Sequence, residues 1–332
     1  MTTQWTINTQ GDPIGTFQQL VMQVWENAGL DAMLVSVNGD AKPRLLKGPQ
    51  EMTHVNPFKP LMTANAAKLV PGLLNRYPDY RLGLLFRPCE LRALAAKARR
   101  EELPLDRVVT ICADCLGTYP AEDYSWRARR IGSSDQLSQE TLQFARLGGI
   151  AAYRFRSACQ VCASPVGEGA DLNVGIFGLP VRQHMLVEAR DQATAMRLGI
   201  DALPVVAADP GISAQRERTV AKLVQRHSQT RERVLRGLGE LLPSNIETLI
   251  RQLQDCAECR ECFNNCPICV GEFPQRGIDG SILRDDILQW MVSCAGCGMC
   301  EQACPKHKPL GTIFAYIREQ LASIGSELDY AI

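Results

Sequence analysis

The sequence predicts an α/β domain with a largely parallel sheet, followed by a mostly helical C-terminal domain. Over residues 1–205, short apolar runs typical of buried strands alternate with segments whose apolar residues recur at helical spacing. Residues 206–243 are rich in Arg, Gln and Glu, which is typical of an exposed helical connector. Residues 244–332 carry two cysteine runs of identical spacing, each approached by a helical pattern. We therefore expect two domains joined by a helix.

The first domain is expected to alternate helices and strands in chain order. Helices are predicted at residues 14–28, 65–74, 90–100 and 192–198, and strands at 32–37, 81–86, 107–112, 174–179 and 185–189. Gly29 ends the first helix, because glycine adopts the left-handed conformation of a helix C-terminus at low cost. Cys89 and Cys115 come just after two of the strands, and sites in parallel sheets lie beyond the carboxyl ends of strands. Both cysteines are therefore expected at one edge of the sheet.

Three helices are expected around the cysteine runs of the C-terminal domain. Pro243 marks the boundary, and Ser244-x-x-Glu247 has the form of a capping box that opens a helix leading into the first run. A second helix, over residues 281–292, leads into the second run. A third helix follows, with aligned apolar residues at Leu310, Ile313, Phe314, Ile317 and Leu321. These helices favour a mostly helical domain over a compact βαβ arrangement.

The composition is that of a globular protein without a general affinity for polyanions. The chain has 332 residues, of which 45% are hydrophobic and 22% charged, as in ordinary globular proteins. Its 36 basic and 36 acidic residues balance, so no binding to nucleic acid or anionic membranes is implied. The sequence shows neither a secretory signal nor an apolar run of the roughly 20 residues that a membrane helix needs. We therefore expect the fourteen cysteines to bind metal in the reducing cytoplasm rather than to form disulfides.

The two cysteine runs share the pattern C-x2-C-x2-C-x3-C-P. The first run is Cys256, Cys259, Cys262 and Cys266, and the second is Cys294, Cys297, Cys300 and Cys304. Bacterial ferredoxins with two 4Fe–4S clusters have this spacing, and the fourth cysteine of each run ligates the other cluster. The spacing therefore assigns Cys256, Cys259, Cys262 and Cys304 to one cluster, and Cys266, Cys294, Cys297 and Cys300 to the second. Structural zinc, the alternative, usually shows two separated C-x2-C pairs, which these runs fit poorly.

Six of the fourteen cysteines lie outside this cluster assignment. They are Cys89, Cys112, Cys115, Cys159, Cys162 and Cys269. The segment Cys159-Gln160-Val161-Cys162 has metal-ligand spacing, but the chain has no second pair of matching form. Taken alone, the pair fits a redox dithiol as well as half of a zinc site.

Four segments that contain or follow these cysteines occur in a characteristic order. They are residues 86–94 (FRPCELRAL), 109–118 (VTICADCLGT), 159–162 (CQVC) and 170–175 (ADLNVG). Their order and residues resemble the coenzyme F-420 hydrogenase/dehydrogenase beta-subunit family. The C-terminal runs, with Cys266-Pro267-Ile268-Cys269, particularly resemble its formate dehydrogenase beta subunits. The resemblance covers about residues 80–178 and 255–320.

The resemblance implies a third 4Fe–4S cluster in the α/β domain, beside a flavin. The implied ligands are Cys89, Cys115, Cys159 and Cys162. Cys112 could replace Cys115 as a ligand, but it occupies a position where the family usually has glycine. We expect Cys112 and Cys269, the two cysteines left over, to be buried structural thiols. The family has a double glycine before a Thr-containing helix start at the flavin, whereas residues 11–17 read GDPIGTF. The family resemblance thus implies FAD as a possible cofactor, but the residues of this segment do not support flavin binding.

These motifs predict an iron–sulfur electron-transfer subunit of a cytoplasmic multi-subunit oxidoreductase. The resemblance implies partner subunits of the formate dehydrogenase, nickel–iron hydrogenase or heterodisulfide-reductase type, and catalysis by this chain only if a flavin is bound. One alternative is a flavin-free cluster relay and scaffold. Another is a self-contained ferredoxin-dependent reductase of a small molecule. The histidines show no arrangement that favours the reductase; they are His54, His184, His227 and His307.

Overall fold

The α/β part of the molecule is built on one mixed sheet. The computed structural model describes residues 3–36, 42–149, 155–241, 259–269 and 293–324, together with Thr248. The strands are β1 (Thr3–Asn8), β2 (Ala32–Val35), β3 (Arg44–Leu46), β4 (Leu82–Phe86), β5 (Val108–Ala113), β6 (Leu172–Gly175), β7 (His184–Ala189) and β8 (Val205–Ala207). Their order in the sheet is β3-β2-β4-β5-β6-β7-β1-β8. The pairs β2–β4, β4–β5 and β5–β6 are parallel, and the other four pairs are antiparallel.

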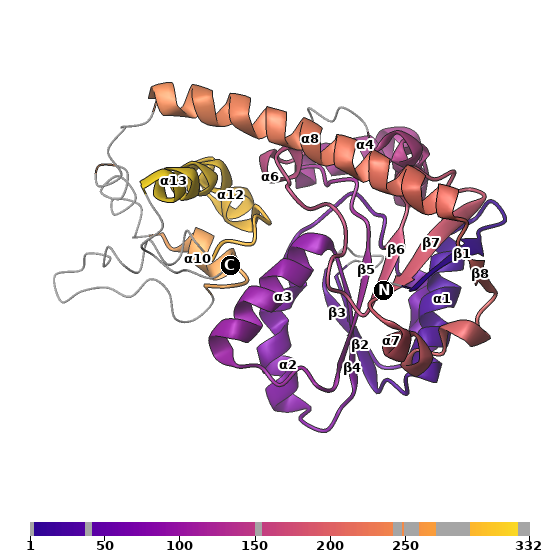
Figure 1. Cartoon of the computed structure of the whole chain (residues 1–332). Helices are drawn as coiled ribbons and strands as arrows, with labels where there is room; N and C mark the ends of the chain where they lie inside the picture. Colours follow the sequence, from indigo (N-terminus) through magenta and orange to yellow (C-terminus); the bar gives the residue numbers. More distant parts are fainter. Residues whose placement is uncertain are drawn as a thin grey trace.

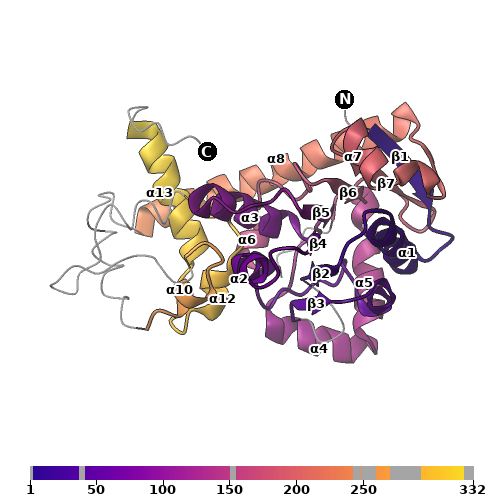
Figure 2. The ribbon, with the colours of Figure 1, turned by 90° about the horizontal axis from the view of Figure 1, so that it is seen from below.

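Helices cover both faces of this sheet (Figures 1 and 2). Met33 and Val35 pack on one face with α1 (Pro13–Asn27), α5 (Ser134–Gln143) and α7 (Gln192–Arg197). Ala32 and Leu34 point to the other face, against α2 (Val70–Arg76) and α3 (Pro88–Glu101). The shorter elements are η1 (Pro49–His54), η2 (Ala66–Leu69), α4 (Ala121–Ile131), η3 (Ala145–Leu147), α6 (Ser157–Gln160) and η4 (Ile200–Ala202). Because both faces are buried, β2 and β4 carry no polar side chain, as is usual for strands of parallel sheets.

The expectation of a largely parallel sheet is therefore wrong outside the block from β2 to β6. The segment 176–183 between β6 and β7 is too short for the crossover that parallel strands need, so these two strands pair antiparallel. The strand expected at residues 174–179 ends at Gly175, because Ile176 N donates a hydrogen bond to the Asp114 carboxylate at 2.9 Å. The unpredicted β1 pairs with β7 and β8, far away in sequence.

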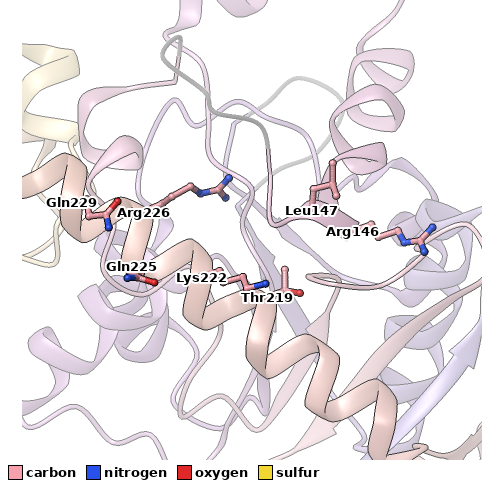
Figure 3. A pocket seen from close by; sticks show the side chains of 7 residues that line it. All are labelled: Arg146, Leu147, Thr219, Lys222, Gln225, Arg226 and Gln229. Carbon is pink, nitrogen blue, oxygen red and sulfur yellow. The ribbon is translucent and has the colours of Figure 1, made fainter.

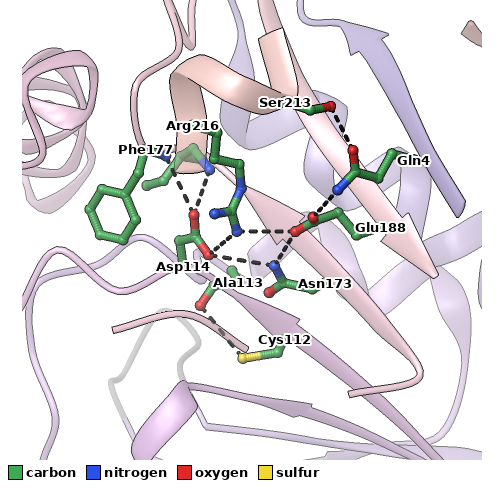
Figure 4. Close-up of polar contacts among 10 residues, drawn as sticks. Gln4, Cys112, Ala113, Asp114, Asn173, Phe177, Glu188, Ser213 and Arg216 are labelled. Carbon is green, nitrogen blue, oxygen red and sulfur yellow. Dashed lines mark hydrogen bonds and ion pairs between the residues drawn. The ribbon is translucent and has the colours of Figure 1, made fainter. Parts of the chain in front are cut away.

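A buried polar network fixes the start of the long helix α8 (Pro210–Leu241) on the sheet (Figure 4). Arg216 Nη2 lies 2.9 Å from an Asp114 oxygen and 3.1 Å from a Glu188 oxygen. Glu188 also accepts hydrogen bonds from Asn173 Nδ2 at 2.9 Å and Gln4 Nε2 at 2.8 Å. Burial raises the pKa of Asp114, and the Arg216 charge opposes the rise. Arg216 thus joins α8 to Asp114, which follows β5, and to Glu188 of β7. Glu188 in turn binds residues of β1 and β6.

From the sheet, α8 runs to the C-terminal helices (Figure 1). These helices are α10 (Glu261–Asn265), α12 (Met299–Ala303) and α13 (Leu310–Ile324), the last of which confirms the expected third helix. The helix expected from Ser244 lies outside the described residues except for Thr248, which is helical, and the helix expected at residues 281–292 lies wholly outside them. Ile268 inserts into the apolar cluster of α2 and α3, which anchors the C-terminal part on the α/β part. No helix in the described ranges is long and apolar enough to span a membrane.

Candidate metal centres

Four cysteines of the α/β part lie near one edge of the sheet. Cys89 is in the first turn of α3, which begins directly after β4. Cys115 follows β5, the parallel neighbour of β4. Cys159 belongs to the short helix α6, and Cys162 comes just after it. These are the four residues that the family resemblance implies as ligands of a cluster.

Backbone hydrogen bonds join the segments that carry these cysteines. Cys115 N donates to the Pro165 carbonyl at 2.9 Å, and Arg156 N donates to the Thr118 carbonyl at 2.9 Å. The Thr118 hydroxyl oxygen also lies 3.4 Å from the Cys159 sulfur. The loop after β5 and the segment around α6 are thus held side by side, although about forty residues separate them in sequence.

The four thiols form one electrostatic group. Burial raises the pKa of Cys115 to about 11, and the charges of Cys159 and Cys162 contribute to the rise. Burial also raises the pKa of Cys89, with further contributions from Glu90 and Cys115. Without metal, such buried thiols favour the protonated form, and a bound metal would displace their protons.

Two arginines turn their guanidinium groups toward this thiol group. Arg156 Nη2 lies 3.8 Å from the Cys159 sulfur, and Arg92 Nη2 lies 3.8 Å from the Cys162 sulfur. Burial would raise the pKa of Cys159, but the Arg156 charge and hydrogen bonds from Thr118 bring it below its ordinary value. Neither arginine was predicted from the sequence. Each stands three residues from a cysteine, Arg92 from Cys89 and Arg156 from Cys159, a spacing that brings side chains together on a helix.

A third arginine, Arg87, lies at the same edge of the sheet, directly after β4. Its Nη2 donates to the carbonyls of Lys59 at 2.6 Å and Leu61 at 2.9 Å, and its Nη1 has no hydrogen-bond partner among the described residues. Its charge lowers the pKa of Cys115 against the larger effect of burial. Three fixed positive charges therefore surround a site that would gather four negative thiolates.

A second group of four cysteines lies in the C-terminal part. Burial raises the pKa of Cys297 to about 12, and the charge of Cys266 is the next contribution. Burial likewise raises the pKa values of Cys294 and Cys300, and the charge of Cys266 contributes to both. Cys266 ends α10 and belongs to the first run, but it lies with the three leading cysteines of the second run. The spacing predicts these four residues as ligands of one cluster, and their ligation stays a prediction.

The first run has the reciprocal arrangement. Burial raises the pKa of Cys262 to about 11, with contributions from the charges of Cys259 and Cys304. Cys304, which ends α12, thus lies with the first run, although about forty residues separate it from Cys262. Cys259 is exposed at the protein surface. Cys256, the fourth predicted member of this group, lies outside the described residues.

The two remaining cysteines are buried, as expected. Cys112 is fully buried and is the second-to-last residue of β5, whereas Cys115 lies in the loop that follows this strand. Cys269 is 2% exposed and packs beside Cys266 and Cys294. Burial, followed by its hydrogen bond with Cys266, raises the pKa of Cys269. Cys269 is therefore a neighbour of the second group, which its treatment as a spare thiol did not predict.

The group of the α/β part and the second group offer the donor atoms that a 4Fe–4S cluster needs. In the described ranges, no three His, Cys, Asp or Glu side chains are arranged to hold one metal ion. A 4Fe–4S cluster binds each thiolate at a different iron, so its ligands lie farther apart than those of a single tetrahedral ion. Four buried or half-buried thiols beside positive charges match such a cluster in donor type and number.

Two histidines support the loops that carry cysteines. His227 of α8 has its Nδ1 2.7 Å from the Cys162 carbonyl oxygen, and burial lowers the pKa of His227. His307 has a positive φ of 49° and its backbone N–H donates to the Cys304 carbonyl at 3.0 Å, so it forms the turn after the second run. His227 is thus a positioning residue, although no sequence pattern indicates this contact.

The segment that corresponds to the family's double glycine is a regular helix start. Asp12 caps α1, because its Oδ1 accepts a hydrogen bond from Gly15 N at 2.9 Å. Pro13 takes the first helical position, where proline is favoured. Thr16 donates its hydroxyl to the Asp12 carbonyl at 2.8 Å. A carboxylate and a proline ring therefore occupy the place of the glycines, and this segment does not fit the close approach of a flavin.

A polar hollow of about 470 Å³ lies between η3 and α8, apart from the cysteine groups (Figure 3). It is lined by Arg146, Leu147, Thr219, Lys222, Gln225, Arg226 and Gln229. Arg226 Nη2 donates to the Gly148 carbonyl at 2.6 Å and so closes one side of the hollow. Because the lining contains no thiol, the hollow contributes no ligand to the candidate metal centres.

Two known proteins are similar to this chain, one in sequence and one in fold. No protein-family model matches the chain. The chain is 21% identical over 323 residues to the beta subunit of the F420-dependent formate dehydrogenase of Methanocaldococcus jannaschii. The match covers 83% of this chain and 79% of that protein. Its fold is similar to a chain of the F420-reducing NiFe hydrogenase complex of Methanosarcina barkeri, with a TM-score of 0.51 and 13% identity over 70% of this chain and 91% of that chain. Together these likenesses confirm the resemblance to the coenzyme F-420 hydrogenase/dehydrogenase beta-subunit family that the cysteine motifs indicate.

Proposed function

We propose that the chain is an iron–sulfur electron-transfer subunit of a cytoplasmic, F420-linked oxidoreductase complex of the formate dehydrogenase or hydrogenase type. It would hold three 4Fe–4S clusters. Their proposed ligands are Cys89, Cys115, Cys159 and Cys162 at the α/β site; Cys266, Cys294, Cys297 and Cys300 at the middle site; and Cys256, Cys259, Cys262 and Cys304 at the outer site. The name of the formate dehydrogenase relative supports the assignment to an oxidoreductase subunit.

The neighbourhood of Cys89 and Cys297 carries this proposal. Cys89 packs against the small apolar cluster of Met62, Cys297 and Met299, and the charge of Cys297 contributes to the raised pKa of Cys89, after burial. A ligand of the α/β site thus adjoins a ligand of the middle site. Clusters exchange single electrons, and transfer between them requires that they lie close together. The contact supports a continuous series of sites rather than isolated structural clusters.

The outer site supplies the end that faces a partner subunit. Its Cys259 is exposed, whereas Cys297 and Cys300 of the middle site are buried. A partner that exchanges electrons with the chain would therefore dock over the outer site. By the family resemblance, that partner is a subunit of the formate dehydrogenase, hydrogenase or heterodisulfide-reductase type.

A flavin-free relay is the second candidate, and the cap formed by Asp12 and Pro13 favours it. In that case, the α/β site would receive electrons from another subunit instead of from a flavin in the same chain. The two candidates share all three clusters, so they differ only in flavin content.

Iron and flavin contents of protein purified without oxygen test both candidates. About twelve irons, four for each of three clusters, would support the proposal. One flavin per chain in addition would favour direct exchange with F420, and none would favour the relay. About eight irons would contradict the α/β site, and a content near zero would contradict the electron-transfer function.

A further inference from the structure

Two arginines lie across the boundary between the α/β site and the middle site. Arg156, which is 8% exposed, donates from Nε to the Thr118 hydroxyl at 2.8 Å and from Nη1 to Gln302 Oε1 of α12 at 3.2 Å. Arg92 donates from Nη1 to the Ser164 carbonyl at 2.7 Å and from Nε to the Ala295 carbonyl at 3.3 Å. Each guanidinium therefore hydrogen-bonds both parts of the molecule.

The charges of both arginines act on thiols of both sites. Burial would lower the pKa of Arg156, but the charges of Cys159, Cys89 and Cys297 raise it. Burial acts on the pKa of Arg92 in the same direction, and the charges of Cys162, Cys89 and Cys297 outweigh it. Because arginine stays protonated in proteins, each side chain is a fixed positive charge between the two thiol groups.

Two other arginines each act on a thiol of one of these sites. The Arg87 charge acts on Cys115 of the α/β site. Arg318 donates from Nη1 to the Cys294 carbonyl at 3.1 Å, and its charge lowers the pKa of Cys294 against burial. Arg318 therefore provides a matched comparison, since it is a cation that hydrogen-bonds Cys294 of the middle site.

We propose that Arg92 and Arg156 are shared tuning residues, which raise the reduction potentials of the clusters on both sides of the boundary between Cys89 and Cys297. The proposal rests on the proposed function, because it needs a cluster at each site. One electron would leave one site and arrive at the other, with no bond made or broken and no proton moved. Reduction makes each site more negative by one charge, and a fixed positive charge in a buried region stabilises the more negative state.

Redox titrations of the complete protein, monitored by electron paramagnetic resonance, test the proposal. Arg156→Gln keeps a hydrogen-bonding group but removes the charge. We expect it to make reduction of both adjoining clusters about tenfold less favourable, which is a shift of about 59 mV for a one-electron couple. Arg156→Lys keeps the charge and should shift both potentials less. Arg318→Gln should shift only the middle cluster, and Cys159→Ser, which lacks the α/β cluster, identifies the signals.

The iron content of each sample separates failure of this proposal from failure of the proposed function. Wild-type protein with only about eight irons would lack the α/β cluster, and both proposals would fail together. Full iron with unchanged potentials in Arg156→Gln, or with a shift at one cluster only, would overturn the shared role alone. If Arg156→Gln does not assemble, Arg92→Gln gives the same test, because Arg92 bridges the same boundary through its own set of contacts.

Discussion

The α/β part and the C-terminal part gather their cysteine groups in different ways. In the C-terminal part, the described members of each group come from one short run, apart from Cys266 and Cys304, which are exchanged between runs. In the α/β part, Cys89 and Cys115 follow separate strands, and the other two members come from the segment around α6. Local spacing forms the first kind of site, whereas the sheet forms the second. The two kinds of site should therefore respond differently to substitutions.

Removal of single cysteines should have the largest effect. Cys159→Ser should lower the iron content from about twelve to about eight and leave the C-terminal clusters intact. Cys304→Ser should abolish the outer cluster, although Cys304 belongs to the second run. The reason is that Cys304 lies near Cys262, whose pKa its charge helps to raise. Iron analysis and electron paramagnetic resonance would measure both losses. Loss of the middle cluster, with the outer one retained, in Cys304→Ser would refute the exchange between runs.

The sheet should depend on its buried charges for stability. Arg216→Ala would leave Asp114 and Glu188 without their cation, and breaking a buried ion pair on one side costs about 3–5 kcal/mol. We expect a correspondingly lower urea midpoint for unfolding of the sheet, followed by circular dichroism. Arg218→Ala, at an exposed position of the same helix, is the control and should cost about 0.5 kcal/mol or less. Equal midpoints for the two variants would show that the network adds little stability.

The contact between the two parts can be tested at one glycine. Gly298 has a φ of 68°, and a Cβ there would lie 2.6 Å from the Cβ of Ala158 in α6. Gly298→Ala should therefore cost about 1–2 kcal/mol for backbone strain and about 1–3 kcal/mol more for overpacking. Gly296→Ala is matched, since its φ is 67° and no described atom lies within 4 Å of the added Cβ.

The difference between these two glycine variants isolates the contact. Urea unfolding should show a lower midpoint for Gly298→Ala than for Gly296→Ala. The double variant Gly298→Ala/Ala158→Gly, which removes the opposing Cβ, should recover part of the difference. If Gly298→Ala and Gly296→Ala unfold at the same midpoint, the two parts do not pack at this point in solution.

The same contrast explains what the sequence could predict. The grouping of the C-terminal cysteines follows from local spacing, and the edge position of Cys89 and Cys115 follows from strand order. The pairing of β1 with β7 and β8 was missed, because no local pattern shows which distant strand a segment joins. Arg92 and Arg156 were missed for a similar reason. Their charge acts on Cys297, which only the packing of the C-terminal part on α3 and α6 brings near.

The smallest effect is expected for Cys112→Ala, and its comparison with Cys115→Ala is a sharp test of the site built by the sheet. Cys112 is fully buried within β5, whereas Cys115 lies in the following loop, where the charges of Cys159 and Cys162 contribute to its raised pKa. Cys112→Ala should therefore keep about twelve irons and cost about 1 kcal/mol of stability, a typical value for a single substitution. Cys115→Ala should lose about four irons. The opposite result in iron analysis would mean that a strand residue, and not the loop beyond it, supplies the ligand. The sheet would then hold the metal directly instead of only positioning the loops that do.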